Sequence, residues 1–522
     1  MGNSISHFYK AIANKCHVTT ICFLVILSVC SCASLPKDVE RIPSYKISPK
    51  HTSALNTIIE PATQAHPDQS GVVLLHEAER AFRARHEMTA LAEHSLDVQY
   101  YIWQNDKAGR ILAQRLLSAA NRGVRIRVLL DDFSLHVKDS YLVAFATHPN
   151  IHIRIFNPFT DRNTKDLGFI TDIERVNHRM HNKLFVLDNS VAVVGGRNIG
   201  DNYFGIKDSY NSRDIDILTI GPVVDQVSQS FDEYWNSDWA YPIQSIYKHK
   251  MDDERANKLR EDINKQASLD LLSFPFTLET DKNKIIETAR SGLNTLNWAH
   301  IDVIFDPSDK FDGDPNTVTT QFNTTLGEVQ HEMLAEIAYF VPGNAMVAGF
   351  KEAHKNGVHI RFLTNSLNST EVLPAYAGFA NYRKKLLQAG VELYEYRSDA
   401  KERSTWPKPS HQALSRLHSK TFVVDRRYSF IGSYNFDPRS MDINTEIGLL
   451  IDSPEFAKKV IKVLDSGIEP GNAWKLELDE QHQRLEWHDQ QGSPALYKEP
   501  HSTWWQRFKT SILRMLPIEH QL

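Results

Sequence analysis

HSKTFVVD, residues 418–425, places a histidine and a lysine two positions apart, directly before an apolar run that ends in an aspartate. HNKLFVLD, residues 181–188, repeats this pattern 237 residues earlier. Short runs of Phe, Val and Leu favour buried β-strands. The two stretches therefore predict one strand unit that occurs twice in the chain.

A second pair of segments supports an internal duplication. GVRIR at 123–127 aligns with GVHIR at 357–361, at an offset of 234 residues. In both places this strand pattern follows an earlier strand pattern and a helical one, and such units build parallel sheets through right-handed crossovers. Two independent features at nearly the same offset indicate a repeat. The sequence thus predicts an α/β fold with two duplicated lobes.

The polar residues of each motif are expected to share one face. In a β-strand, the side chains at i and i+2 point the same way. We therefore expect His181 and Lys183 to project together, and likewise His418 and Lys420. Each lobe then presents a titratable imidazole beside a fixed cation.

Each motif continues through a tight turn, predicted at Asn189-Ser190 and Arg426-Arg427, into a second strand that ends at glycine. The glycines open the sequences GGRN and GSYN, and glycine lets a backbone approach a ligand closely. Asn198 and Asn435 end these sequences, and we expect both to return to the histidine edge and bind phosphate.

Two such half-sites facing each other suit a phosphodiester. Lysines and asparagines can hold the non-bridging oxygens and stabilise the charge of a five-coordinate phosphorus. One neutral histidine can attack phosphorus while the other, protonated, gives its proton to the departing alkoxide. Histidine is the side chain that can take both roles near neutral pH.

The double pattern HxKxxxxD, followed by GGxN or GSxN, resembles the phospholipase D superfamily over approximately residues 71–470. The resemblance implies that each lobe is a mixed sheet flanked by helices, with the active site between the lobes. It also implies a phosphohistidine intermediate, no metal and no other cofactor. The catalytic motif residues are then His181, Lys183, Asp188, His418, Lys420 and Asp425, of which the two aspartates are structural.

A carboxylate should fix the tautomer of each imidazole. Acidic residues orient the histidines in the superfamily, and by this resemblance Glu446 serves His418 and Asp216 serves His181. Asp214 shares the strand face of Asp216, so the choice between them stays open. The resemblance also implies that His181, in the first copy, is the nucleophile and His418 the general acid.

The flanks of the motifs are similar to bacterial cardiolipin synthases of the C type, on the sequences GGRNIGDNYFG, GSYNFDPRSMDINTE and LPIEHQL. This likeness implies a phosphatidyltransferase, with phosphatidylethanolamine as the donor and phosphatidylglycerol as the acceptor. Three alternatives are a hydrolase that releases phosphatidic acid, a nuclease-type phosphodiesterase and a lipoprotein that binds anionic lipid without turnover. The near-balanced charge, −5 from 59 basic and 64 acidic residues, argues against nucleic acid as a partner.

The N-terminus has the organisation of a lipoprotein signal peptide over residues 1–32. Lys10 and Lys15 precede the apolar run VTTICFLVILSV, which is short for a membrane span. Ser31 precedes Cys32, which we expect to carry lipid; an uncleaved signal anchor is the alternative. Either would hold the protein on a membrane of the bacterial cell envelope. All four cysteines lie in this segment, so neither a disulfide nor a cysteine nucleophile is available to the lobes.

The rest of the chain divides into five predicted segments. In the last of them, STWWQRFKTSILRML has apolar residues at helical spacing with interleaved cations, which is typical of a helix in a bilayer interface. A helix that docks on the protein core fits nearly as well. The segments are a tether at 33–75, a first lobe at 76–250, a helical connector at 251–300, a second lobe at 301–470 and a C-terminal tail at 471–522.

Overall fold

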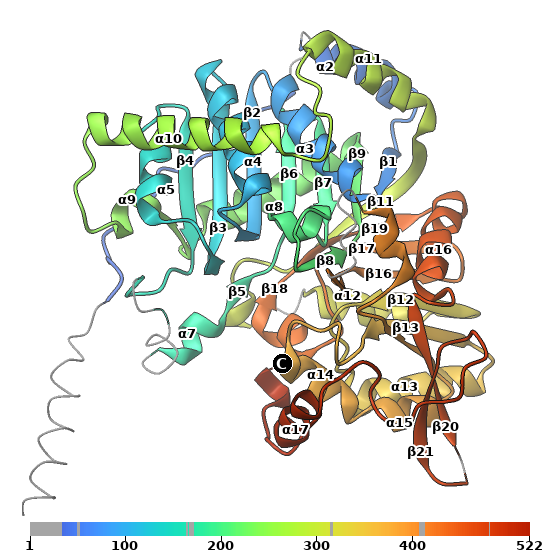
Figure 1. The fold of residues 1–522 in the computed structure, drawn as a ribbon. Coiled ribbons are helices and arrows are strands. Elements are labelled where there is room, and N and C mark those ends of the chain that lie inside the picture. Colours follow the sequence, from blue (N-terminus) through green and yellow to red (C-terminus); the bar gives the residue numbers. More distant parts are fainter. Residues whose placement is uncertain are drawn as a thin grey trace, which may run out of the picture.

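The structure is a computed structural model that describes residues 34–49, 53–162, 165, 172–313, 317–406, 413–479 and 481–521. The predicted signal peptide and its Cys32 lie outside the described residues. Two α/β lobes pack side by side, the first in blue to green and the second in yellow to red (Figure 1). The predicted fold class is confirmed. No helix in the described ranges is long and apolar enough to cross a membrane.

The first lobe is a mixed sheet with one parallel half and one antiparallel half. The parallel half runs from β2 to β3 to β4, and the antiparallel half continues from β2 through the first motif strand. The strand order is β10 (Ala240–Pro242), β4 (Ile151–Phe156), β3 (Arg125–Leu135), β2 (Ser95–Trp103), β6 (Leu184–Leu187), β7 (Val191–Gly195), β9 (Asp216–Ile220) and β1 (Ser70–Leu75).

The second lobe repeats this order strand for strand, which confirms the duplication. Its parallel half is β12, β13 and β14, and its motif strand is β16. The order is β20 (Ala473–Asp479), β14 (Glu392–Tyr396), β13 (His359–Asn365), β12 (Glu332–Ile337), β16 (Lys420–Val424), β17 (Tyr428–Gly432), β19 (Ile447–Asp452) and β11 (Asn297–Phe305), with β21 (Arg484–His488) beyond β20.

The two sheets meet edge to edge. β1 and β11 occupy equivalent edge positions and pair with each other in antiparallel fashion, Ser70 opposite Ala299 and Val72 opposite Asn297. One apolar cluster spans the junction and includes Val72, Ile301 and the apolar faces of α8 (Pro222–Asn236) and α16 (Pro454–Ile468). This shared packing fixes the lobes relative to each other and so fixes the site between them.

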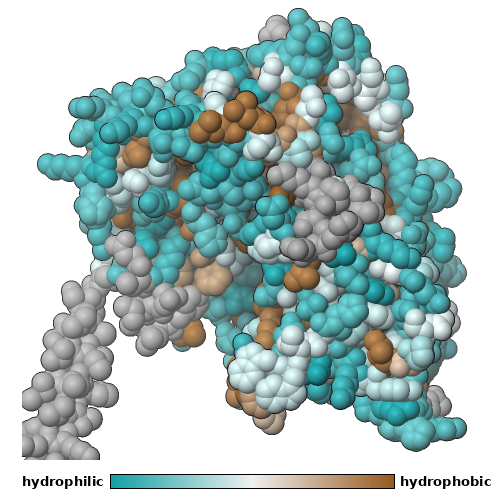
Figure 2. All heavy atoms as spheres, in the orientation of Figure 1, coloured by the Kyte–Doolittle hydropathy of each residue, from teal (hydrophilic) through white to brown (hydrophobic). Residues whose placement is uncertain are grey.

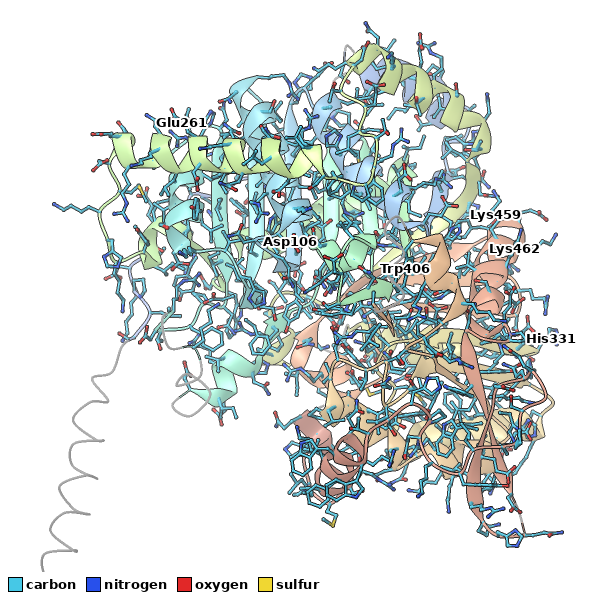
Figure 3. All side chains as sticks on the ribbon, in the orientation of Figure 1. Asp106, Glu261, His331, Trp406, Lys459 and Lys462 are labelled. Atoms are coloured by element: carbon cyan, nitrogen blue, oxygen red, sulfur yellow. The ribbon has the colours of Figure 1, made fainter. Side chains whose placement is uncertain are left out.

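Helices cover the outer faces of both sheets. α4 (Lys107–Asn121) and α5 (Asp139–Ala146) follow the first parallel strands, and α13 (Gly343–Lys355) follows β12 in the second lobe. The connector forms α10 (Asp253–Leu272), which lies across the first lobe with Glu261 pointing away from it (Figure 3). The predicted strand–helix–strand crossovers are therefore present in both halves.

Three predicted boundaries need correction. The segment expected to be a tether contains α2 (Ala54–Gln64), and its last residues form β1 inside the sheet. The connector ends within β11, and the tail begins with β20 and β21, which extend the second sheet. Short apolar strands such as β1 carry little periodicity of their own, and only the neighbouring strands give them a place. The tail helix is α17 (Trp504–Leu513).

Candidate active site

Each motif histidine follows a short strand that pairs with the opposite lobe. β5 (Arg179–Met180) runs parallel to β18 (Asn444–Thr445), and β15 (Leu414–Leu417) runs parallel to β8 (Tyr210–Arg213). The pairing continues to the histidines, since His181 N donates to Thr445 O at 2.9 Å and His418 N to Arg213 O at 2.8 Å. The backbone of one lobe thus positions the histidine of the other.

The prediction that histidine and lysine share one strand face is wrong. β6 begins at Leu184, after both residues, and β16 begins at Lys420, after His418. At both histidines the chain lies outside its own sheet, and its backbone bonds to the other lobe. Histidine and lysine stay together through a different contact, because Nζ of Lys183 donates to the carbonyl of His181 and Nζ of Lys420 to that of His418.

The carboxylates that hold the imidazoles cross between the lobes. His181 Nδ1 lies 2.8 Å from Glu446 Oε2, and His418 Nδ1 lies 2.6 Å from Asp214 Oδ2. All four side chains are buried. The predicted partners, Glu446 for His418 and Asp216 for His181, are therefore wrong. With Nδ1 occupied on each ring, Nε2 is the nitrogen left for chemistry.

Asp216 has a structural place instead. Its Oδ2 lies 2.9 Å from Arg85 and 3.4 Å from Arg197, all three side chains being at most 1% exposed. Sheet register explains why the neighbouring aspartate takes the catalytic position. Gly195 faces Asp216 and, in the second copy, Gly432 faces Gly448. Two positions earlier, Asp214 therefore corresponds to Glu446.

GGRN and GSYN differ at their second residue, and this difference matches the carboxylate in each lobe, which is Asp214 in the first and Glu446 in the second. A Cβ at Gly196 would stand 2.1 Å from Asp214 Oδ1, so glycine makes room for the carboxylate rather than for a ligand. The equivalent Ser433 instead donates its hydroxyl to Glu446 Oε2. Each lobe thus contains the residue that accommodates its own carboxylate, although that carboxylate contacts the histidine of the other lobe.

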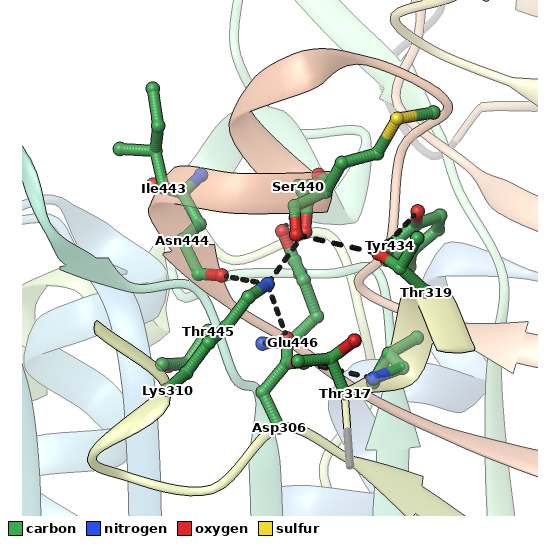
Figure 4. A network of polar contacts seen from close by, with 12 residues as sticks. Asp306, Lys310, Thr317, Thr319, Tyr434, Ser440, Ile443, Asn444, Thr445 and Glu446 are labelled. Carbon is green, nitrogen blue, oxygen red and sulfur yellow. Dashed lines mark hydrogen bonds and ion pairs between the residues drawn. The ribbon is translucent and has the colours of Figure 1, made fainter. Parts of the chain in front are cut away.

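A network of polar contacts around the buried side chain of Lys310 supports Glu446 (Figure 4). Nζ of Lys310 lies 3.0 Å from Asp306 Oδ2 and donates to the carbonyls of Ser440 at 3.0 Å and Asn444 at 2.8 Å. Asp306 Oδ2 accepts from Glu446 N at 2.9 Å, and the Ser440 hydroxyl donates to Glu446 Oε1 at 2.8 Å. Sequence reasoning missed this network, because an isolated lysine in a short 3-10 helix (η3, Lys310–Asp312) carries no signal of burial.

The two asparagines bind the neighbouring strand ends. Asn198 Oδ1 accepts from Ile102 N at 3.0 Å, and Asn435 Oδ1 accepts from Tyr339 N at 3.3 Å. Both side chains are buried at the histidine edge of the sheets. Because the oxygen faces the backbone, Nδ2 is the end of each amide that can donate to a ligand; phosphate binding stays a prediction.

The motif aspartates cap a strand start rather than facing the histidines. Asp188 accepts from the backbone N–H groups of residues 93–95 at 2.7–3.1 Å, and Asp425 accepts from residues 330–332 at 2.7–3.0 Å. Both have positive φ, 49° and 51°, at the first position of a tight turn. The turns lie at Asp188-Asn189 and Asp425-Arg426, one residue before the predicted positions. These contacts fit the structural role that the resemblance implies.

Aromatic rings line the site and were not predicted. The ring of Tyr101 lies edge-on to His181 with centroids 5.0 Å apart, and Tyr203 lies edge-on to His418 at 5.2 Å. Nζ of Lys183 lies 5.6 Å from the centroid of Tyr101. These rings give the two imidazoles apolar neighbours, and an apolar environment strengthens electrostatic interactions.

Burial sets unequal protonation for the two histidine–carboxylate pairs. Burial, and then Lys183 and Lys420, bring the pKa of His181 well below its ordinary value, while burial raises the pKa of Glu446 to about 7. Burial also lowers the pKa of His418, against the opposing effect of Asp214. Burial alone would raise the pKa of Asp214, but His418 and the neighbouring cations bring it below its ordinary value.

The protonation of the lysines is also altered by burial. Burial lowers the pKa of Lys183 to about 7 and lowers that of Lys420. Among the described residues, no group of three or more His, Cys, Asp or Glu side chains is arranged to hold a metal ion. The site therefore has two imidazoles, each held by a carboxyl group, with two amines whose charge is sensitive to pH.

Comparisons with known proteins agree with this geometry. The family "Cardiolipin synthase, PLD-like domain" matches residues 86–239 and 322–467, which contain the two motifs. "Cardiolipin synthase C" of Escherichia coli (strain K12) is 38% identical over 475 residues, which cover 89% of this chain and 99% of that protein. An uncharacterized protein of Helicobacter pylori (strain ATCC 700392 / 26695) is 33% identical over 452 residues, 84% of this chain and 88% of that one.

A solved structure shares the fold. The crystal structure of phosphatidylserine synthase from Haemophilus influenzae Rd KW20 superposes with a TM-score of 0.55 at 13% identity, covering 89% of this chain and 99% of that chain. At this identity the likeness concerns the fold alone. The paired motifs, the family match over both lobes and the identity over almost the full length of a relative lead to one conclusion: the chain belongs to the phospholipase D-like cardiolipin synthase family.

Proposed function

We propose that this protein is a phosphatidyltransferase that makes cardiolipin through a phosphohistidine intermediate. The observation that carries the proposal is the crossed pairing of His181 with Glu446 and of His418 with Asp214. Each ring is held at Nδ1 and presents Nε2 to the site. Two identically oriented imidazoles supply one nucleophile and one acid, which a displacement at phosphorus requires.

In the first step, His181 Nε2 attacks the phosphorus of the donor phospholipid. A P–N bond forms, the P–O bond to the head group breaks, and His418 gives the proton on Nε2 to the departing oxygen. With phosphatidylethanolamine as the donor, ethanolamine leaves. Lys183 and Lys420 are placed to balance the charge that grows on the phosphoryl oxygens.

In the second step, a hydroxyl of phosphatidylglycerol gives its proton to His418. Its oxygen attacks phosphorus, the P–N bond breaks, and neutral His181 is restored with cardiolipin as the product. If water enters in place of the alcohol, the same step releases phosphatidic acid. The rings of Tyr101 and Tyr203 favour the transfer, because they occupy space beside the imidazoles that water would otherwise fill.

The unequal pairs support the assignment of roles. A nucleophile must be neutral, and the pKa of His181 lies well below its ordinary value because of burial and the two lysines. A general acid must hold a proton; burial lowers the pKa of His418 too, but the Asp214 carboxylate opposes that shift, so His418 keeps a proton more readily than His181 does. We therefore assign attack to His181 and proton transfer to His418.

The purified full-length protein should be incubated with radiolabelled phosphatidylglycerol and phosphatidylethanolamine, and the lipids then separated. Labelled cardiolipin is the expected product. Phosphatidic acid alone would identify a hydrolase. Unchanged lipids, together with cleavage of DNA in a parallel incubation, would identify a nuclease. Either result rejects the transferase. Repeating the incubation in excess chelator should leave the yield unchanged, because lysines supply the positive charge in this mechanism.

We also propose that lipid at Cys32 holds the protein on the membrane that contains its substrates. The motif Cys30-Ser31-Cys32 after an apolar run supports this anchor. Cys32→Ala should abolish incorporation of radiolabelled fatty acid while the purified variant keeps its activity in mixed micelles. Label that persists in Cys32→Ala would contradict the assignment.

A further inference from the structure

α17 is attached to the second lobe through its polar side. Thr510 is the buried residue of the helix, at 4% exposure. Gln506 Nε2 donates to Asn368 Oδ1 at 3.2 Å, and just beyond the helix Arg514 Nε donates to Asn381 Oδ1 at 2.8 Å. A capping box at Thr503 fixes the first turn. These polar contacts hold the helix on the second lobe.

The apolar side of α17 faces outward. Trp504 is 66% exposed, Trp505 52% and Met515 77%, and Phe508 stacks against both tryptophans with centroids 5.2 and 5.3 Å apart. A surface helix of a soluble protein ordinarily turns its apolar stripe to the core. Here the largest apolar side chains lie on the exposed side, which disagrees with the alternative of a helix that docks on the core through them. The exposed residues, together called the aromatic face, are Trp504, Trp505, Phe508, Ile512, Met515 and Leu516.

The chain beyond the aromatic face reaches residues close to the catalytic site. After α17 the chain returns to the first lobe, where Asn177 Nδ2 donates to Gln521 Oε1 at 2.8 Å. Arg439 Nη1 donates to Asn177 Oδ1 at 2.9 Å, and the charge of Arg439 contributes to the lowered pKa of His181. Figure 2 shows α17 as a bulge next to the hollow between the lobes. The end of the tail therefore forms part of the rim of the cleft.

We propose that the aromatic face inserts into the interface of an anionic bilayer and seats the rim of the cleft on the lipid surface. Tryptophan prefers the membrane–water interface, where an apolar ring and a polar N–H are both accommodated. Lys509 places positive charge at the face, with its Nζ 5.4 Å from the centroid of Trp505, and this charge complements anionic head groups. Exposed tryptophans beside a cation suit a bilayer interface, so the bilayer is the occupant that the residues favour.

The insertion can be measured without turnover, in the full-length protein on vesicles of phosphatidylethanolamine and phosphatidylglycerol. Part of the lipid should carry bromine on the acyl chains, which quenches tryptophans at the depth of the interface. Of the nine tryptophans, Trp504 and Trp505 should account for most of the quenching. Trp504→Phe with Trp505→Phe keeps the apolar face and should abolish most of it. Equal quenching in wild type and variant would overturn the proposal.

A second measurement tests the effect on substrate access and rests on the proposed function. Trp504→Ser, Trp505→Ser and Phe508→Ser together should lower the rate on vesicle lipid roughly tenfold, since interfacial affinity depends on buried apolar area. The rate on a water-soluble nitrophenyl phosphodiester should not change. Leu269→Ser with Leu272→Ser, which removes exposed side chains of α10, is the matched control and should leave both rates unchanged.

The outcomes of the two measurements are distinguishable. Quenching by bromolipid without cardiolipin synthesis would retain the docking and reject the proposed reaction. Absence of quenching, with a triple-serine variant that elutes as a smaller particle than wild type, would assign the aromatic face to contact with a second copy and reject the bilayer. Equal loss on vesicle and soluble substrates would mean a general defect of the fold and would also reject it.

Discussion

Nδ1 of His181 and Oε2 of Glu446 lie 2.8 Å apart, although the two residues are separated by 265 positions and belong to different lobes. His418 has the equivalent contact with Asp214, 204 positions away. Neither lobe contains a histidine together with the carboxylate that orients it. The chemistry is therefore a property of the joined pair of lobes, which β1 and β11 hold together.

Asp214 and Asp216 give a matched test of this contact. Asp214→Asn removes the anion beside His418, so we expect a fall in kcat on phospholipid of about 100-fold or more. Asp216→Asn should leave kcat per folded molecule near wild type but lower stability by about 3–5 kcal/mol, since the buried Arg85 loses its partner. Steady-state kinetics and thermal unfolding of both variants show which aspartate orients His418 and which is structural. The reverse pattern would restore the sequence-based choice of Asp216.

The roles of the histidines can be separated by changing the leaving group. A general acid matters little for a good leaving group, whereas a nucleophile is needed for any. His418→Ala should lose activity on phospholipid but release one equivalent of nitrophenol from an activated phosphodiester, and then stall. His181→Ala should give no burst and no acid-labile phosphoryl label. A burst that survives in His181→Ala and vanishes in His418→Ala would reverse the assignment.

Lys183 should give the reaction an alkaline limit. The ammonium is the form that stabilises the phosphoryl charge, and its pKa is lowered to about 7 by burial. Because deprotonation removes the charge as pH rises, kcat/KM on the nitrophenyl diester, which needs no acid, should fall as pH increases through about 7. Arginine keeps its proton throughout this range, so Lys183→Arg should move the fall to higher pH. An unchanged profile in Lys183→Arg would exclude Lys183 as its cause.

Lys310 should contribute to both stability and activity. Lys310→Met leaves Asp306 buried without its cation and frees the carbonyls of Ser440 and Asn444, so we expect a loss of about 3–5 kcal/mol in unfolding free energy. Adding Asp306→Asn should restore part of the stability, because no uncompensated charge is then buried. The kcat of the folded single variant should also fall, since the network positions Glu446. Wild-type kcat would limit Lys310 to a role in folding.

Asp425 should act on stability alone. Burial raises its pKa, but the hydrogen bonds from the backbone of residues 330–332 together bring the pKa below its ordinary value. A carboxyl group with a depressed folded pKa adds stability above its unfolded pKa and loses it as pH falls through the folded value. Asp425→Asn should therefore be less stable than wild type near neutral pH, by roughly 1–3 kcal/mol, and the difference should shrink in acid. Urea unfolding at several pH values measures this, and a specific loss of kcat would contradict it.

The repeat could be predicted because the residues of each motif lie close together in the sequence. His181 and His418, with the lysines and asparagines that follow them, keep their spacing within each copy, and the strand order repeats accordingly. The resemblance to a known family rests on the same local pattern. Local alternation also identified Asp214 as a rival to Asp216, on one strand face. What local sequence can encode was therefore largely predictable.

The crossing of the carboxylates could not be predicted in this way. Whether Glu446 meets His418 or His181 depends on how the lobes face each other, and that follows from the pairing of β1 with β11 and of β5 with β18. The strand-face argument failed for a related reason, since the residues around His181 leave their own sheet for the other lobe. Contacts between lobes are long-range, and a single sequence carries little trace of them.

The crossed pairing also has a consequence for how the two halves can evolve. In a symmetric dimer of identical half-molecules, one gene would dictate the same carboxylate for both histidines. Fusion of the halves removes that constraint. His418 can then be oriented by Asp214, which lies against Gly196. His181 can be oriented by Glu446, which accepts a hydrogen bond from Ser433. A single chain can thus divide labour between two sites of common ancestry, and each carboxylate can be selected for the task of a histidine in the opposite half.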